Sequence, residues 1–270
     1  YLAEHLASHG YVVAALEHPG SNETHVRQAL QLKAPLLEGQ EFLNRPKDIS
    51  FVLDELQKLN QTSGSLQGKL AADKAMIVGY SLGGATALSL AGAELQLTEL
   101  KQRCPGNVLA FSLGENAQCF AKDLPEESYQ LRDPRIKAAI ALSPTTSLLF
   151  GETGLTKVAI PTLITAGSAD KTTPVLTEQV VAFDKLPSPK WLAGFVGGTH
   201  LSVKDPSTTM DQADQPDTLY SGGEVVGEQA VDVRNYMKAI ALAMAAQLTN
   251  EAGKYAVFLT PEYAQLASTQ

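Results

Sequence analysis

The stretch that decides the fold is KAMIVGYSLGGATALSLA, residues 74–91. Residues 74–79 are almost entirely apolar, which predicts a strand buried on both faces of a sheet. This strand passes directly into a helix over 82–91, whose small residues allow it to lie close to the sheet. The junction between them is Gly79-Tyr80-Ser81-Leu82-Gly83, so Ser81 stands in a sharp strand-to-helix turn of the G-x-S-x-G type.

Alternating strands and helices continue on both sides of this stretch. Strands are expected at 11–16, 136–142, 161–166 and 191–196, and helices at 2–8, 48–59, 174–186 and 231–248, with Arg45-Pro46 beginning the second helix. Such alternation predicts a parallel sheet covered by helices on both faces. We expect one α/β domain over residues 1–270, with a polar surface loop at 204–229.

Residues 94–133 interrupt the alternation and are longer than most connections in a compact domain. We expect them to form a lid or cap insertion. Both cysteines, Cys104 and Cys119, lie in this segment. Two interpretations stay open: a disulfide, which would indicate a secreted or periplasmic protein, or two reduced thiols, which would fit a cytoplasmic one.

Composition excludes some classes of partner. The net charge of -8 argues against nucleic-acid binding, which depends on Lys and Arg neutralising phosphates. No run reaches the roughly 18 apolar residues of a membrane span. The chain begins inside an amphipathic pattern without Met or a signal peptide, so we expect a natural protein that is longer at the front, or a sheet with a gap.

Ser81 needs a base that removes its proton, and histidine can supply one near neutral pH. Around this type of turn, the order along the chain is Ser, then Asp or Glu, then His. Four of the five histidines precede Ser81, and His200 alone follows it. His200 comes after the strand at 191–196, at the strand end where parallel sheets bind ligands. We therefore expect Ser81 as nucleophile and His200 as general base.

The acid that orients the base should follow the preceding strand. Asp170 comes directly after the strand at 161–166, in Gly167-Ser168-Ala169-Asp170, and is our choice. Asp184, inside a predicted helix, and Asp205, after His200, are the competitors. The backbone N–H of Leu82 is the expected first oxyanion donor. The second donor comes from a loop after an earlier strand, and we do not find that loop in this sequence.

Five stretches together resemble one branch of a known superfamily. They are 17–22 (EHPGSN), 42–49 (FLNRPKDI), 79–84 (GYSLGG), 167–170 (GSAD) and 198–200 (GTH). The chain resembles the bacterial platelet-activating-factor acetylhydrolase-like and dienelactone-hydrolase-like branch of the α/β hydrolases. The resemblance implies the α/β-hydrolase fold, a triad on Ser81, Asp170 and His200, and lipase-like or short-chain esterase activity on small-molecule or lipid esters. It also implies no cofactor and no metal.

Other residues have less certain roles at the sequence level. Glu17 and His18 end a predicted strand and either line the substrate pocket or are an ordinary polar strand end. Tyr80 either forms a pocket wall or packs in the core, and Trp191 is expected in the core. Two alternatives to an esterase stay open: a non-catalytic binding protein with the same fold, and an acyltransferase that uses the same triad.

Overall fold

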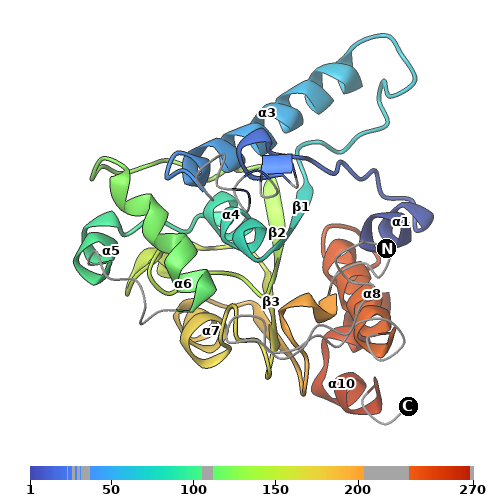
Figure 1. Ribbon diagram of the computed structural model, residues 1–270. Helices are drawn as coiled ribbons and strands as arrows, with labels where there is room; N and C mark the ends of the chain where they lie inside the picture. Colours follow the sequence, from blue (N-terminus) through green and yellow to red (C-terminus); the bar gives the residue numbers. More distant parts are fainter. Residues whose placement is uncertain are drawn as a thin grey trace.

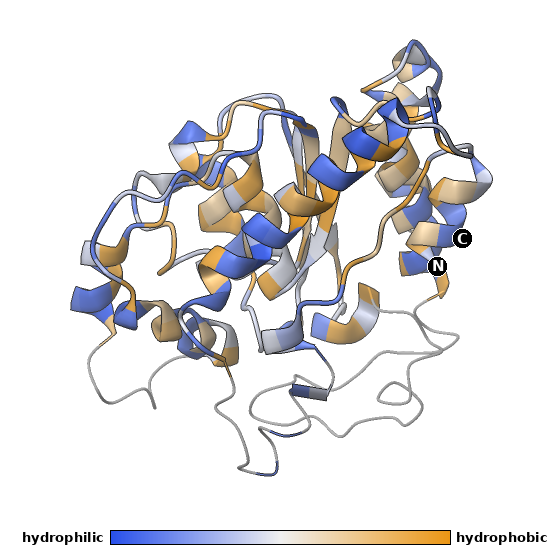
Figure 2. Cartoon of the chain, turned by 90° about the horizontal axis from the view of Figure 1, so that it is seen from above, coloured by the Kyte–Doolittle hydropathy of each residue, from blue (hydrophilic) through white to orange (hydrophobic). Residues whose placement is uncertain are grey.

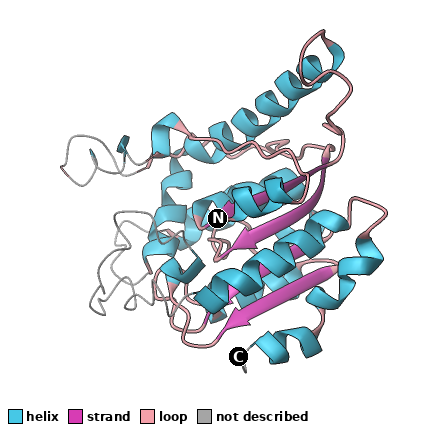
Figure 3. Ribbon diagram, turned by 90° about the vertical axis from the view of Figure 1, so that its right-hand side faces the viewer, coloured by secondary structure: helices cyan, strands magenta, loops and turns pink. Residues whose placement is uncertain are grey.

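The computed structural model describes residues 1–22, 24–25, 28, 31, 37–104, 112–203 and 231–267. Its centre is a four-stranded sheet in the order β1-β2-β3-β4, with every neighbouring pair parallel. The strand arrows accordingly run in one direction (Figure 3). The strands are β1 (Ala75–Tyr80), β2 (Ile136–Leu142), β3 (Thr162–Gly167) and β4 (Lys190–Phe195). The predicted α/β architecture with a parallel sheet is confirmed.

Helices cover both faces of this sheet (Figure 1). One face carries α3, α4, α5, α6 and α7, and the other carries α1 and α8. The helices are α1 (Leu2–Ser8), α3 (Glu41–Gln61), α4 (Leu82–Ala91), α5 (Leu97–Arg103), α6 (Leu113–Gln118), α7 (Val181–Lys185), α8 (Val231–Ala246), α9 (Ala252–Tyr255) and α10 (Pro261–Ala267). Shorter helical turns are η1 (Pro19–Ser21), η3 (Cys119–Asp123), η4 (Gly154–Lys157), η5 (Leu176–Val180), η6 (His200–Val203) and η9 (Ala256–Leu259).

Strand β2 shows how the sequence specifies these layers. Successive side chains of a strand point to opposite faces. Ala139 and Ala141 accordingly belong to the core beneath α4, whereas Ala138 and Ile140 belong to the core beneath α8. The apolar sides of the helices face the sheet (Figure 2). Both faces of the central strands are therefore buried, as their continuous apolar runs predict.

The expected strand at 11–16 is wrong. These residues form no strand, and Val12 and Val13 are 62% and 39% exposed. A strand needs a neighbour for its backbone hydrogen bonds, and within the described residues β1 pairs with β2 alone. An apolar run without a pairing partner is therefore not enough to make a strand.

The helix expected from residue 48 begins earlier, at Glu41. Pro46 does not begin this helix as we expected but lies inside it, where it has no N–H to donate to the preceding turn. Phe42 and Leu43 are buried at 5% and 4% exposure. Their burial in the core accounts for the helix extending ahead of the proline.

The segment expected as an insertion, residues 94–133, contains α5, α6 and η3. Several of its apolar side chains, among them Leu97, Leu100 and Leu124, belong to the same core cluster as α4. The described residues of this segment therefore pack on the domain, and a lid function remains a prediction. The surface loop expected at 204–229 lies outside the described residues. Among the helices that are described, none has the length and apolar character needed to span a membrane.

Candidate active site

Ser81 lies in the turn between β1 and α4, with φ 54° and ψ −116°. Its backbone N–H donates to the Leu142 carbonyl at 2.8 Å, which fixes the turn on the neighbouring strand. A Cβ atom on residue 79 would lie 1.9 Å from the Gly83 carbonyl oxygen. Only glycine fits at position 79, as the steric explanation of the motif requires.

His200 and Asp170 lie beside Ser81, although they are distant in the sequence. The Nε2 atom of His200 is 3.0 Å from Ser81 Oγ, and its Nδ1 is 2.8 Å from Asp170 Oδ2. His200 and Asp170 are buried at 6% and 4% exposure, and Ser81 is half-buried. The structure therefore brings together the three side chains predicted as a triad.

Two loops must approach each other closely to make this contact. The Ala169 N–H donates to the Gly198 carbonyl at 2.9 Å. A Cβ atom on residue 167 would lie 2.4 Å from the Gly198 carbonyl oxygen. Gly167 therefore allows the loop that carries Asp170 to lie against the loop that carries His200.

Thr173 is a site residue that the sequence analysis missed. Its hydroxyl lies 2.8 Å from Asp170 Oδ2 and 3.2 Å from His200 Nδ1, and its N–H donates to Asp170 Oδ1 at 2.8 Å. Both oxygens of the carboxylate are thus held, which fixes the plane of Asp170 against the imidazole. The spacing Asp-x-x-Thr, an acceptor three residues before the N–H that it binds, is a signal that could have suggested this contact.

The residues proposed for the pocket have different surroundings. The Tyr80 hydroxyl donates to the His200 carbonyl at 2.9 Å, and the two rings lie 5.0 Å apart. His18 is buried, with its Nδ1 2.7 Å from Asp48 Oδ2, and Glu17 is exposed. Tyr80 therefore supports the backbone of His200, whereas pocket roles for Glu17 and His18 remain predictions.

The expected oxyanion donor, the competing acids and Trp191 have the following positions in the structure. Leu82 is the first residue of α4, so its N–H has no carbonyl partner within the helix, and its role as an oxyanion donor remains a prediction. Of the competing acids, Asp184 lies in α7 and Asp205 lies outside the described residues. Trp191 packs against the core cluster beneath α8, as expected. Within the described ranges, no group of three His, Cys, Asp or Glu side chains could hold a metal ion.

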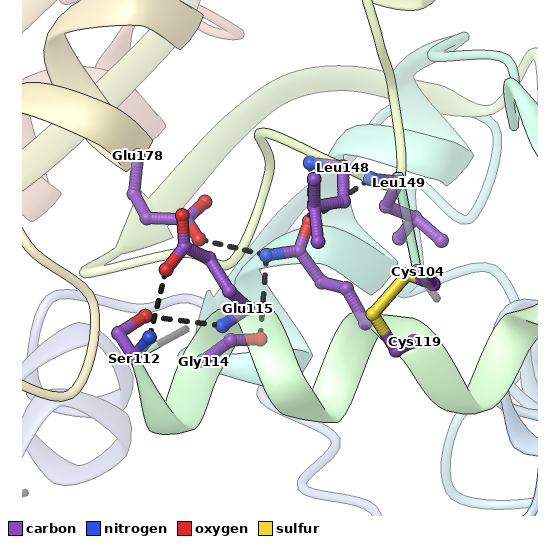
Figure 4. The surroundings of a disulfide bond; sticks show 9 residues. Cys104, Ser112, Gly114, Glu115, Cys119, Leu148, Leu149 and Glu178 are labelled. Carbon is purple, nitrogen blue, oxygen red and sulfur yellow. Dashed lines mark hydrogen bonds between the residues drawn. A yellow bond between two sulfur atoms is a disulfide. The ribbon is translucent and has the colours of Figure 1, made fainter. Parts of the chain in front are cut away.

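Cys104 and Cys119 form a disulfide (Figure 4). The bond joins the end of α5 to the start of η3, and both cysteines are buried. Of the two open interpretations, the structure thus contains the disulfide, which is typical of proteins in oxidising compartments.

No protein-family model matches the chain, and no curated protein matches it either. The functional assignment therefore depends on the residues of the site.

Proposed function

We propose that the chain is a serine hydrolase of the α/β-hydrolase type that cleaves carboxylic esters. The observation that carries this proposal is the line of contacts from Ser81 Oγ through His200 to Asp170, at 3.0 and 2.8 Å. These contacts are within the reach required for proton transfer from hydroxyl to imidazole. The carboxylate of Asp170 accepts a hydrogen bond from the Nδ1–H of His200, which leaves Nε2 free to accept a proton from Ser81.

The reaction then follows from this geometry. Ser81 Oγ attacks the ester carbonyl carbon as its proton passes to His200 Nε2, and the carbonyl oxygen becomes an oxyanion near the Leu82 N–H. The bond between the carbon and the alcohol oxygen breaks, and His200 gives its proton to the departing alcohol. Water then attacks the acyl carbon as His200 accepts a proton from it. The bond between the acyl carbon and Ser81 Oγ breaks, His200 returns the proton to Oγ, and the acid leaves.

Labelling with a fluorophosphonate tests this assignment directly. The reagent should form one adduct, on Ser81, and p-nitrophenyl esters of increasing chain length should be hydrolysed. Ser81→Ala should abolish labelling and lower kcat by about 10⁴-fold or more, while the circular dichroism spectrum stays unchanged. A folded wild-type protein that forms no adduct on Ser81 would disprove the proposal.

A further inference from the structure

The loop that follows β2, residues 143–149, lies against the backbone of the nucleophile. The Thr145 N–H donates to the Ser81 carbonyl at 3.4 Å. Pro144 packs on the first turn of α4, where a Cβ atom on Gly84 would lie 2.7 Å from the Pro144 Cβ. A shift of this loop would therefore move the backbone that presents the Ser81 hydroxyl.

The same loop also contacts the segment that carries Asp170. The Thr173 hydroxyl lies 3.2 Å from the Ser143 carbonyl oxygen. Helix α6 packs over both segments, since a Cβ atom on Gly114 would lie 2.7 Å from Thr173 Cγ2 and 3.2 Å from Thr145 Cγ2. Loop 143–149 thus lies among the nucleophile, the acid segment and α6.

Two buried side chains hold four consecutive backbone N–H groups of this loop. Glu178 Oε2 accepts from the N–H groups of residues 146 and 147, at 2.5 and 2.8 Å. Gln118 Oε1 accepts from the N–H groups of residues 148 and 149, at 2.9 Å each. Gln118 Nε2 donates to Glu178 Oε1 at 2.7 Å, so the two side chains also bind each other.

The chemistry of this pair is specific. Gln118 and Glu178 are both 0% exposed, and buried polar groups are costly unless each finds a partner. Burial raises the pKa of Glu178, while hydrogen bonds from residues 146 and 147 oppose that rise. The backbone N–H groups of the loop need one acceptor from each of the two side chains. Gln118 must also donate a hydrogen bond to the Glu178 carboxylate. An amide facing a carboxylate meets all of these requirements.

The disulfide lies directly beside this pair. Cys119 follows Gln118 in the chain, and its bond to Cys104 ties the end of α6 to the end of α5 (Figure 4). Gln118 Nε2 also lies 3.3 Å from the Gly114 carbonyl, one turn earlier in α6. The position of the Gln118 amide is therefore fixed by a covalent cross-link as well as by its helix.

We propose that Gln118 and Glu178 are positioning residues of the catalytic centre. They hold loop 143–149 against Ser81 and the Asp170 segment, and the Cys104–Cys119 bond keeps Gln118 in place. This inference rests on the proposed function, because a positioning role requires a reaction at Ser81. The hydrogen bonds of the two side chains run to each other, to α6 and to this loop, so we expect their effect on the triad to pass through the loop.

Exchanging the two groups gives a sharp test. Gln118→Glu alone places two carboxylates together, and Glu178→Gln alone leaves one donor facing another. The double variant Gln118→Glu/Glu178→Gln again supplies an acceptor to every loop N–H and a donor between the two side chains. We expect each single variant to lower kcat about tenfold to a hundredfold with little change in KM, in line with a small misplacement of reacting groups. The double variant should recover most of the loss.

Asn60→Asp is the matched control. The Asn60 amide binds the Leu70 carbonyl and N–H at 2.9 Å each, at the end of α3. This change should lower the melting temperature without lowering kcat in the folded protein. The Cys104→Ser/Cys119→Ser variant, like reduction with dithiothreitol, should lower kcat in the same direction as the single changes. Single variants that keep wild-type kcat while folded, or a double variant no better than the singles, would overturn the inference.

An NMR readout that requires no substrate separates this inference from the proposed function. The proton between His200 Nδ1 and Asp170 should give a downfield signal. That signal should move in each single variant, return in the double variant and stay unchanged in Asn60→Asp. A signal identical in all of these folded proteins would overturn the positioning role, whatever the outcome of the ester assays.

Discussion

Replacing Gly79 by alanine tests whether the turn at Ser81 has the tight geometry described above. The new Cβ would lie 1.9 Å from the Gly83 carbonyl oxygen and 2.9 Å from the Gly84 nitrogen, and both are backbone atoms that no side-chain rotation can move away. To remove this overlap, the first turn of α4 must move by about 1 Å. A displacement of this size can lower a reaction rate about a hundredfold. Overpacking of this kind should also lower the free energy of unfolding by about 3 kcal/mol.

The assay compares urea unfolding and p-nitrophenyl acetate hydrolysis with those of a second glycine variant. Gly194, in β4, is the control because a Cβ atom there would have no neighbour within 4 Å. Gly194→Ala should change the free energy of unfolding by less than about 1 kcal/mol and leave kcat unchanged. If Gly79→Ala kept wild-type kcat and stability, the steric explanation of the turn would be refuted.

Two further substitutions test individual contacts. Thr173→Val removes the hydroxyl that lies 2.8 Å from Asp170, a hydrogen bond to a charged group worth about 2 kcal/mol. If about 1.4 kcal/mol of this hydrogen-bond energy acts in the transition state, kcat falls about tenfold. A variant that is less stable but keeps the wild-type kcat would contradict an orienting role for Thr173. Burial alone would raise the pKa of Asp133, but hydrogen bonds from Arg135 outweigh it and leave this pKa below its ordinary value of 3.8. The ionised Asp133 therefore stabilises the fold above that value, and this contribution is lost as the pH falls through the lower pKa of the folded state. Asp133→Asn should lower the free energy of unfolding by about 2 kcal/mol at pH 7 and by progressively less as the pH falls below 3.8. Urea unfolding over this pH range measures the difference, and a cost that does not change with pH would contradict the prediction.

Local patterns were sufficient to predict most of the sheet. Strand β2 (Ile136–Leu142) has the bounds expected from its apolar run, and the other three strands differ by about a residue. Such runs are informative because a strand covered on both faces has no polar side to interrupt them. The same rule failed at 11–16, since burial and pairing depend on what lies beside a segment as well as on its own residues.

Within the site, the sequence could suggest residues but not contacts. Ser81 has a local motif, and the order of elements placed Asp170 and His200 after successive strands. Thr173 has no feature that distinguishes it from other threonines until Asp170 is seen to face it. Gln118 and Glu178 are 60 positions apart, and polar residues are usually exposed, so nothing local predicts that they meet inside the core.

The backbone at Ser81 has a consequence for how this protein balances stability against activity. Its φ of 54° lies in a region that a non-glycine residue occupies at a cost of about 1–3 kcal/mol. Glycine would adopt this conformation without strain, so the residue that suits the fold best at this position is one without a hydroxyl. Selection for resistance to heat alone would favour glycine at this position and so remove the hydroxyl on which the proposed reaction depends.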